Sequence, residues 1–270
     1  MKVPEVSVLM PVYNIELYLR EAMDSILQQT FTNFEFIIVN DGSTDGTEEI
    51  VLSYKDDRIR YYKNEKNSGV IYTLDRAMNL SKAKYLARMD GDDISLPDRL
   101  QKQYDYLQKN NCDVVASCVQ LIDKNGKNIG YWGEDKNNIS AIAIKNYLPI
   151  NNCIAHPTIM MKSDILKKYK YNPKQKHNED YDLWLRITAD GKIIHKIEEP
   201  LLLHRYLQTS VTRTRKLNVF FNLMMVKFVF VKQQIKQGKI SVFVLKTFVF
   251  CVIDGLKGIG KLIKQKVVSQ

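Results

Sequence analysis

Residues 85–93 have the sequence YLARMDGDD, in which three carboxylates follow directly after an apolar, strand-like run. Crowded carboxylates repel one another and usually need a cation, and Mg²⁺ and Mn²⁺ prefer oxygen ligands. Asp90 and Asp92 would leave an extended chain on the same side, with Gly91 between them allowing close approach to a ligand. Asp93 would point elsewhere and cap the following helix. The stretch predicts either a metal site held by Asp90 and Asp92 or an ordinary solvated acidic turn.

Strand and helix patterns alternate around this stretch. Apolar runs predict strands at residues 6–10, 34–39, 59–62, 85–89, 114–122 and 154–161. Apolar residues at helical spacing predict helices at 17–28, 47–54, 69–80, 96–109 and 163–168, and another that begins near Glu179. The polar region 124–152 is expected to form loops with one short helix. This alternation predicts an α/β fold with a mostly parallel sheet flanked by helices.

Three polar clusters follow strands of the predicted sheet. They have the sequences PVYN (residues 11–14), NDGS (40–43) and DGDD (90–93). In α/β sheets ligands bind beyond the carboxyl ends of the strands, so we expect the three clusters to line one crevice. No G-x-G-x-x-G or P-loop sequence follows a strand, which argues against a dinucleotide oxidoreductase or an NTPase. The convergence favours the metal-site interpretation of residues 90–93.

Length and cysteine usage add broader expectations. A chain of 270 residues fits one large domain, or one domain with an appendage. The four cysteines are scattered without a C-x-x-C pair, which suggests neither a zinc site nor a disulfide framework. The N-terminus leads straight into a strand and leaves no room for a signal peptide, so a cytoplasmic location is expected.

Charge is distributed very unevenly along the chain. Of the 40 Lys and Arg and 30 Asp and Glu residues, 12 and one respectively lie in residues 213–270, a net charge of +11. Residues 1–212 therefore hold 28 basic and 29 acidic residues, a net charge of −1. A nucleic-acid-binding body would be basic, so the excess charge describes a partner of the tail alone. We expect a globular domain over 1–212 and a helical tail over 213–270.

The tail is apolar as well as basic. Residues 217–231 and 240–263 are rich in Phe, Val, Leu and Ile, but lysines interrupt them before they reach the length of a membrane span. On a helix over 240–264, four lysines would share one face: Lys246, Lys257, Lys261 and Lys264. This pattern predicts a helix that lies on an anionic membrane surface. The alternative is a helix that docks on the core and leaves its lysine face in water.

The order of these motifs resembles family 2 glycosyltransferases of the GT-A fold. The shared motifs are PVYN (11–14), NDGSTD (40–45), NSG (67–69), DGD (90–92) and Glu179-Asp180, within a resemblance that covers about residues 5–212. The resemblance implies transfer of a sugar from a nucleotide-diphosphate donor, most often UDP, with inversion. The family often has Asp where this chain has Asn40, so one carboxylate is missing. The Gln-x-x-Arg-Trp signature of processive synthases is also absent, which argues for addition of single sugars.

The resemblance also implies roles for individual residues. Tyr13 would pack against the nucleotide base and Asp41 would accept a hydrogen bond from it, although Asp41 also suits a turn before Gly42. Arg76 would touch the diphosphate or remain a solvated helix residue. The residues that we expect to bind the nucleotide sugar are Pro11, Tyr13, Asn14, Asp41, Asn67, Gly69, Arg76, Asp90 and Gly91. The expected metal ligands for Mn²⁺ or Mg²⁺ are Asp92 and Asp90.

Inversion requires a base on the face of the sugar opposite the leaving group. Asp180 resembles the base of the family, with Glu179 beside it and Asp182 as a weaker alternative. Alternatively, Glu179 and Asp180 only favour the positive end of their helix. His156 is a minor candidate near the acceptor, and a lone histidine is more often structural.

The sequence thus predicts an inverting glycosyltransferase on the cytoplasmic face of a membrane. Its acceptor would be a saccharide on a lipid carrier such as undecaprenyl diphosphate, in O-antigen, capsule or related synthesis. A nucleotidyltransferase that acts on sugar phosphates is the alternative enzyme, but it would need a Gly-rich basic loop where this chain has PVYN. A non-catalytic nucleic-acid-binding protein would need basic residues over the folded body.

Overall fold

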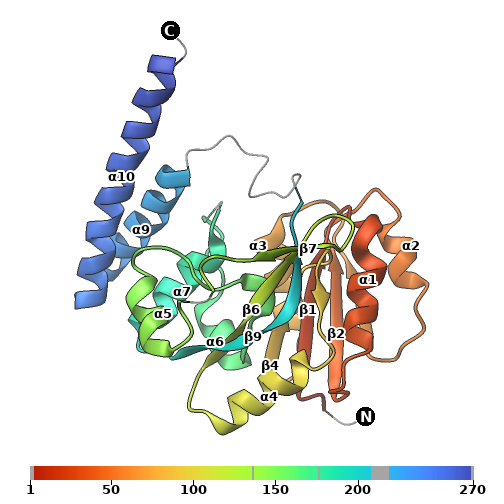
Figure 1. The fold of residues 1–270 in the computed structure, drawn as a ribbon. Coiled ribbons are helices and arrows are strands. Elements are labelled where there is room, and N and C mark those ends of the chain that lie inside the picture. The colour runs from red at the N-terminus through yellow and green to blue at the C-terminus, as the bar shows by residue number, and fades with distance from the viewer. Residues whose placement is uncertain (1–2, 136, 176, 208–218, 269–270) are drawn as a thin grey trace.

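The computed structural model describes residues 3–135, 137–175, 177–207 and 219–268, with the side chains of the last helix described as far as residue 263. A central sheet carries helices on both faces, and two C-terminal helices lie at one end (Figure 1). The strands are β1 (Val6–Val12), β2 (Phe34–Asn40), β3 (Ile59–Lys63), β4 (Tyr85–Arg88), β5 (Ile94–Ser95), β6 (Val114–Ile122), β7 (Asn128–Tyr131), β8 (Met160–Lys162) and β9 (Ile194–Arg205). The helices are α1 (Glu16–Leu27), α2 (Thr47–Leu52), α3 (Val70–Leu80), α4 (Arg99–Lys109), α5 (Ala141–Tyr147), the 3₁₀ turn η1 (His156–Thr158), α6 (Ser163–Tyr169), α7 (Glu179–Ala189), α9 (Val219–Lys236) and α10 (Val242–Val268).

The sheet is mixed, with strand order β3-β2-β1-β4-β8-β6-β9-β5 and β7 paired to β6. The first four strands of this order are parallel, as the alternation of strands and helices predicts. β8 then runs antiparallel to both β4 and β6, and further antiparallel pairs join β5 to β9 and β6 to β7. The prediction of an α/β fold is confirmed, and its parallel part is the half that carries residues 11–14, 40–43 and 90–93.

Apolar side chains fill both faces of the sheet. Residues of β1 and β2 alternate between the two core clusters, so that Met10 packs on one face and Leu9 on the other. α1 and α4 cover the face of Met10, whereas α3 and α7 cover the face of Leu9. Both faces are buried, which explains why these strands are continuous apolar runs rather than alternating ones. Trp184 of α7 is fully buried in the cluster that contains Leu9.

Two sequence predictions about local structure are wrong. Residues 154–161 do not form one strand, because Pro157 lies in the turn η1 and only the short β8 follows it. Asp93 does not cap a helix that begins at Leu96; α4 begins at Arg99, after Asp98. The sequence analysis also did not predict β9, a strand of 12 residues that contains Pro200.

The C-terminal helices form an antiparallel pair that packs on α7 through one face. Val226 and Phe230 of α9, with Phe243 and Val244 of α10, join the core cluster that contains Trp184. α10 then extends well beyond the body of the protein (Figure 1). The tail therefore does dock on the core. Residues 213–218 and the side chain at position 264, both part of the predicted tail, lie outside what the structure describes.

The opposite face of α10 is apolar and exposed. Its seven residues, spaced alternately by three and four, are 48–82% exposed: Val242, Leu245, Val249, Val252, Leu256, Ile259 and Ile263. At 100° per residue, Lys246 and Lys257 lie beside this stripe. Within the described part of the chain, no helix is both long enough and apolar enough to cross a membrane.

Candidate active site

The ends of β1, β2 and β4 bring the three polar clusters together. Val12 is in register with Asn40, and the backbone nitrogen of Asp41 donates to the carbonyl of Val12 at 2.8 Å. On the other side of β1, the nitrogen of Met89 donates to the carbonyl of Leu9 at 3.1 Å. The clusters thus lie at one edge of the parallel half of the sheet, where α/β proteins bind their ligands.

Asp41 is buried and organises the loop before α3. Its Oδ1 accepts hydrogen bonds from Asn64 Nδ2 at 2.7 Å and from the nitrogen of Ser68 at 2.9 Å. Its Oδ2 accepts one from the nitrogen of Gly69 at 2.9 Å. Asn67 lies exposed on the same loop. Asp41 therefore supports the predicted nucleotide site whether or not it also contacts a base.

Residues 11–14 and the loop after β2 are joined through Asn14. The Asn14 side-chain oxygen accepts from the nitrogen of Thr44 at 2.8 Å, and its backbone nitrogen donates to Ser43 Oγ at 3.0 Å. Asn14 has a φ of 48°, a left-handed conformation that Asn adopts more easily than most residues. Pro11 lies within β1, and Tyr13, which follows the end of β1, is 46% exposed. The Tyr13 ring is thus available for stacking against a planar ligand.

Arg76 contacts the same loop rather than open solvent. Its guanidinium donates to the carbonyl of Lys63 at 2.7 Å and to the side-chain oxygen of Asn64 at 2.5 Å. Since Asn64 in turn donates to Asp41, Arg76 supports the loop that Asp41 organises. A contact between Arg76 and a diphosphate stays a prediction.

The acidic turn brings three carboxylates together, not two. Oxygen atoms of Asp90, Asp92 and Asp93 all lie within 4.8 Å of one another. Residues 91–93 form a turn instead of continuing the strand, so the expectation that Asp93 points away is wrong. A Cβ at Gly91 would lie 3.1 Å from Val12 Cγ1, so this glycine allows the turn to pack against β1. Three clustered carboxylate oxygens are a donor set that suits Mg²⁺ or Mn²⁺.

Two cations balance part of this negative charge. The buried Arg88 forms a two-bond ion pair with Asp90, and His204 Nδ1 lies 3.0 Å from Asp93 Oδ1. Burial opposes a charge on His204, but Asp93, Asp90 and Asp92 outweigh it and raise its pKa to about 9. Among the described residues Asp92 has no ion-pair partner. Burial, with Asp93 and Asp90 nearby, raises the pKa of Asp92 to about 7.

The sequence analysis did not find His204, nor the part that Arg205 plays. Arg205 is buried: its nitrogen donates to Asp93 Oδ1 at 2.9 Å and its Nε to the carbonyl of Asp92 at 2.8 Å. Its guanidinium also pairs with Glu21 at 2.5 Å and lies over the ring of Tyr18. Both residues end β9, and the apolar run Leu201–Leu203 before them was the signal for a strand that leads to the site.

Asp180 lies in the first turn of α7, and the charge of Arg88 acts on it. Asn152 Nδ2 donates to Asp180 Oδ2 at 2.8 Å. Burial and the charge of Glu179 raise the pKa of Asp180 to about 7, although Asn152 and Arg88 act in the opposite direction. A carboxylate with this pKa is suited to accept a proton near neutral pH.

Two other candidates are committed to internal contacts. Asp182 is fully buried and pairs with Arg186 at 2.9 Å, so this weaker alternative is not available as a base. His156 is buried against Trp184 and shares a 2.7 Å hydrogen bond with Tyr171. Burial and the nearby Arg88 hold the pKa of His156 well below its ordinary value. These contacts favour a structural role for His156.

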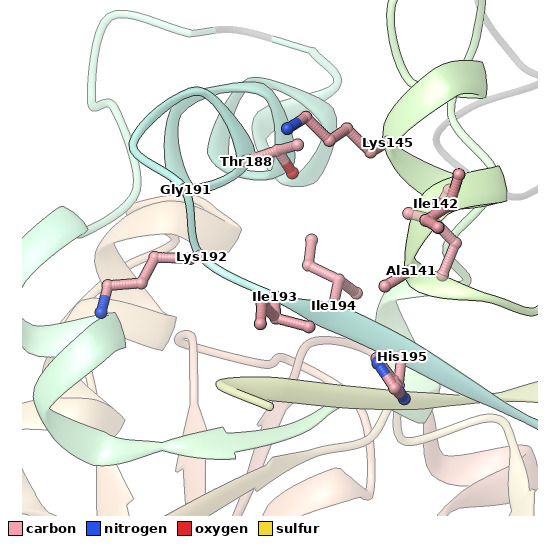
Figure 2. Close-up of a pocket in the computed structure, with 10 residues that line it drawn as sticks. Ala141, Ile142, Lys145, Thr188, Gly191, Lys192, Ile193, Ile194 and His195 are labelled. Carbon is pink, nitrogen blue, oxygen red and sulfur yellow. The ribbon is translucent and has the colours of Figure 1, made fainter. Parts of the chain in front are cut away.

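A separate recess lies between α5 and the start of β9 (Figure 2). Its volume is about 290 Å³, and its walls include Ile142, Lys145 and Ile194. No carboxylate lines it, and the Nδ1 atom of its one histidine, His195, shares a 2.7 Å hydrogen bond with Tyr106. None of the predicted site residues borders this recess, which is therefore distinct from the acidic turn.

A Rossmann-like sheet with a carboxylate cluster after β4 and a separate carboxylate on α7 is typical of glycosyltransferases of the GT-A class. The family model described as "Glycosyl transferase family 2" matches residues 7–170, and the chain belongs to that family. It is therefore a glycosyltransferase, which decides against the two alternative classes. Members of the family commonly use a divalent metal, and the acidic turn offers suitable ligands for one.

Curated relatives support the same assignment. An uncharacterized glycosyltransferase of Methanocaldococcus jannaschii, MJ1057, is 42% identical over 207 residues, which are 75% of this chain and 71% of the relative. The O-antigen biosynthesis glycosyltransferase WbnJ of Escherichia coli is 38% identical over 219 residues, or 77% of this chain and 82% of the relative.

Solved structures confirm the fold. The structure of S. aureus TarS 1–349 in complex with UDP-GlcNAc has a TM-score of 0.67 at 19% identity and covers 84% of this chain. This chain spans 66% of that structure. At this identity the likeness supports the GT-A fold and nothing finer.

Proposed function

We propose that this glycosyltransferase moves a single sugar, with inversion, from a nucleotide-diphosphate sugar to a hydroxyl group of a saccharide acceptor. The observation that supports the proposal is the buried Arg88, which pairs with Asp90 and whose charge also partly opposes the rise in the pKa of Asp180. The charge of one buried cation therefore acts on both of the carboxylate groups that we assign to an inverting transferase. One group would face the leaving diphosphate and the other the incoming hydroxyl.

The residues divide the reaction between them. Asp90 and Asp92 would hold a divalent metal, which when bound supplies positive charge to the leaving diphosphate. Asp180 would take the proton of the acceptor hydroxyl as the hydroxyl oxygen bonds to the anomeric carbon. The bond from that carbon to the diphosphate oxygen would break in the same step, and the nucleoside diphosphate would leave. Glu179 would stay beside the base and keep its pKa high.

The nucleoside would bind at the ends of β1 and β2. UDP is the expected nucleotide, and the related fold of TarS was solved with UDP-GlcNAc. The exposed Tyr13 ring would stack on the base, and the loop fixed by Asp41, including Asn67 and Gly69, would surround it. Asn14 keeps these two loops together.

A lipid-linked acceptor is consistent with the tail. The relative WbnJ acts, by its name, in O-antigen biosynthesis, and surface polysaccharides of this kind fit the predicted use of undecaprenyl diphosphate. The exposed apolar stripe of α10, with lysines beside it, suits an anionic membrane surface. We propose a catalytic domain over 1–212 and a tail over 213–270 that holds it on the inner face of the cell membrane.

A donor screen tests the proposal. UDP-, GDP- and dTDP-sugars would be offered with a lipid-linked acceptor, with and without Mn²⁺, and release of the nucleoside diphosphate measured. We expect one donor to be used only when metal is present. Asp92→Asn should abolish this turnover, and Asp180→Asn should abolish transfer but retain donor binding. The proposal fails if no sugar nucleotide is consumed under any of these conditions.

A further inference from the structure

The segment 146–153, which runs from the last turn of α5 toward η1, is held by the C-terminal helices. Lys227 of α9 donates to the carbonyl of Ile150 at 2.6 Å, and Lys246 of α10 donates to the carbonyl of Asn146 at 2.8 Å. Lys227 is fully buried and also pairs with Asp254 of α10 at 2.6 Å. A buried ammonium is tolerated only when it is paired and hydrogen-bonded, so this geometry is tightly specified.

Asn152 connects this segment to the candidate base. Its side-chain oxygen accepts a hydrogen bond from the nitrogen of Ile154 at 3.0 Å, which turns its amide nitrogen toward Asp180. The bond to Asp180 Oδ2 is 2.8 Å long. The first turn of α7 is held to the same segment, because Tyr181 donates to the carbonyl of Leu148 at 2.5 Å.

The groups around Asp180 explain what this hydrogen bond does. Burial and Glu179 of α7 disfavour the charged carboxylate, whereas the backbone nitrogen of Tyr181, the Asn152 amide and Arg88 favour it. The hydroxyl of Tyr171, whose own pKa is raised by burial, also faces this region. Asn152 donates its hydrogen bond to the charged form of Asp180, which is the form that can accept a proton.

We infer that Asn152 is a positioning residue for Asp180, and that buried Lys227 of the C-terminal pair holds the segment on which Asn152 lies. The inference rests on the proposed role of Asp180 as the base. By this inference, the contacts of α9 and α10 with the catalytic domain help to position Asp180. Removal of the tail contacts should therefore slow transfer even when no membrane is present.

Two variants of Asn152 separate its two hydrogen bonds. Asn152→Asp keeps an acceptor for Ile154 but loses the donor to Asp180, whereas Asn152→Ala loses both. The pKa of Asp180 is measured by ¹³C carboxyl NMR titration, with Asp180→Asn to assign the signal. Loss of a hydrogen bond to a charged group should raise this pKa by about one unit in Asn152→Ala. The rise should be larger in Asn152→Asp because a second carboxylate is added.

Turnover of the donor identified by the screen gives the second readout. We expect kcat to be about tenfold lower in both variants, with little change in the KM for the donor. In a plot of kcat against pH, the rise on the acidic side should move to higher pH. An unchanged Asp180 titration in both variants would overturn the inference. If Asp180→Asn itself transfers sugar normally, the proposed base is wrong instead, so the two failures are distinguishable.

The tail contact is tested with Lys227→Met combined with Asp254→Leu. This pair of changes removes the donor to Ile150 without leaving one buried charge unpaired, and such replacements often preserve folding. We expect this double variant to raise the pKa of Asp180 as Asn152→Ala does. Adding Asn152→Ala to the double variant should give no further rise. Lys261→Met, which removes an exposed lysine of α10, is the control and should leave the pKa unchanged. Additive shifts, or no shift in the double variant, would refute the role of Lys227.

Discussion

At the scale of single residues, the site depends on carboxylates whose surroundings assign them different tasks. Asp41 accepts three hydrogen bonds from residues 64–69, and Asp90 is paired with Arg88. Asp92 and Asp180 are instead held where burial and neighbouring carboxylates raise the pKa of each to about 7. The first lies in a cluster suited to a metal, and the second lies beside Glu179 on α7 and accepts a hydrogen bond from the Asn152 amide. Residue type alone did not distinguish these surroundings.

The pKa of Asp180 predicts the pH dependence of transfer. A base must be deprotonated to act, so the rate should rise as pH increases through about 7 and level off above it. Glu179→Gln removes the neighbouring negative charge and should lower this midpoint. The measurement is kcat against pH with metal and donor saturating. A profile that is flat between pH 5.5 and pH 8.5 would contradict the assignment of Asp180.

The residues found from sequence and those missed differ in a physical way. Asp90 and Asp92 belong to a short motif after a predicted strand, and Asp180 was selected by the family resemblance of Glu179-Asp180, so neither choice needed tertiary information. His204 and Arg205 reach the acidic turn only because β9 pairs with β6 and β5, which is a tertiary arrangement. Asn152 lies in a polar segment without periodicity, and its contact with Asp180 spans 28 positions. Such contacts are set by packing and leave no local signal.

At the scale of elements, most of the strands that were predicted are buried on both faces, and the half-buried β3 is an exception. β1, β2 and β6 are continuous apolar runs, and the predicted bounds of β6 agree with the observed ones. β9 contains two glutamates and Pro200, and its register with β6 shifts around Cys118, so its pattern is broken where the strand bulges. A strand with such a bulge lacks the regular pattern of apolar residues from which strands are predicted.

The loop after β2 has one position that only glycine can occupy. Gly42 has a φ of 72°, and a Cβ there would lie 2.7 Å from the backbone carbon of Lys66. We expect Gly42→Ala to destabilise the protein by about 2 kcal/mol or more, from strain and from the clash. Gly126→Ala is the control, since Gly126 has a φ of 82° but nothing within 4 Å of a Cβ. Urea unfolding that gave equal losses for both variants would disprove the close approach at Gly42.

At the scale of the whole molecule, charge and apolar surface are segregated into the same appendage. The body over 1–212 is close to neutral, whereas the tail carries a net charge of +11. One face of the tail contributes Phe230 and Phe243 to the core, so it is an integral part of the fold. The other face leaves a long apolar stripe exposed on a helix that extends beyond the body (Figure 1). A continuous exposed apolar stripe of this kind usually marks an interaction site.

The stripe predicts attachment to anionic membranes that is separable from catalysis. Leu245→Ser, Val252→Ser and Leu256→Ser together should weaken binding to vesicles of phosphatidylglycerol and phosphatidylcholine at least about 100-fold, because each side chain contributes about 1.5 kcal/mol when buried in lipid. Leu17→Ser with Ile142→Ser, which changes exposed apolar residues of the body, is the control and should bind like the unaltered protein. Co-flotation with vesicles measures binding, and increasing salt should weaken it, since Lys246 and Lys257 flank the stripe. Equal flotation of the stripe variant and the control would show that another surface binds the membrane.

Because the stripe faces away from Lys227, the stripe variant should also keep its turnover with a soluble acceptor.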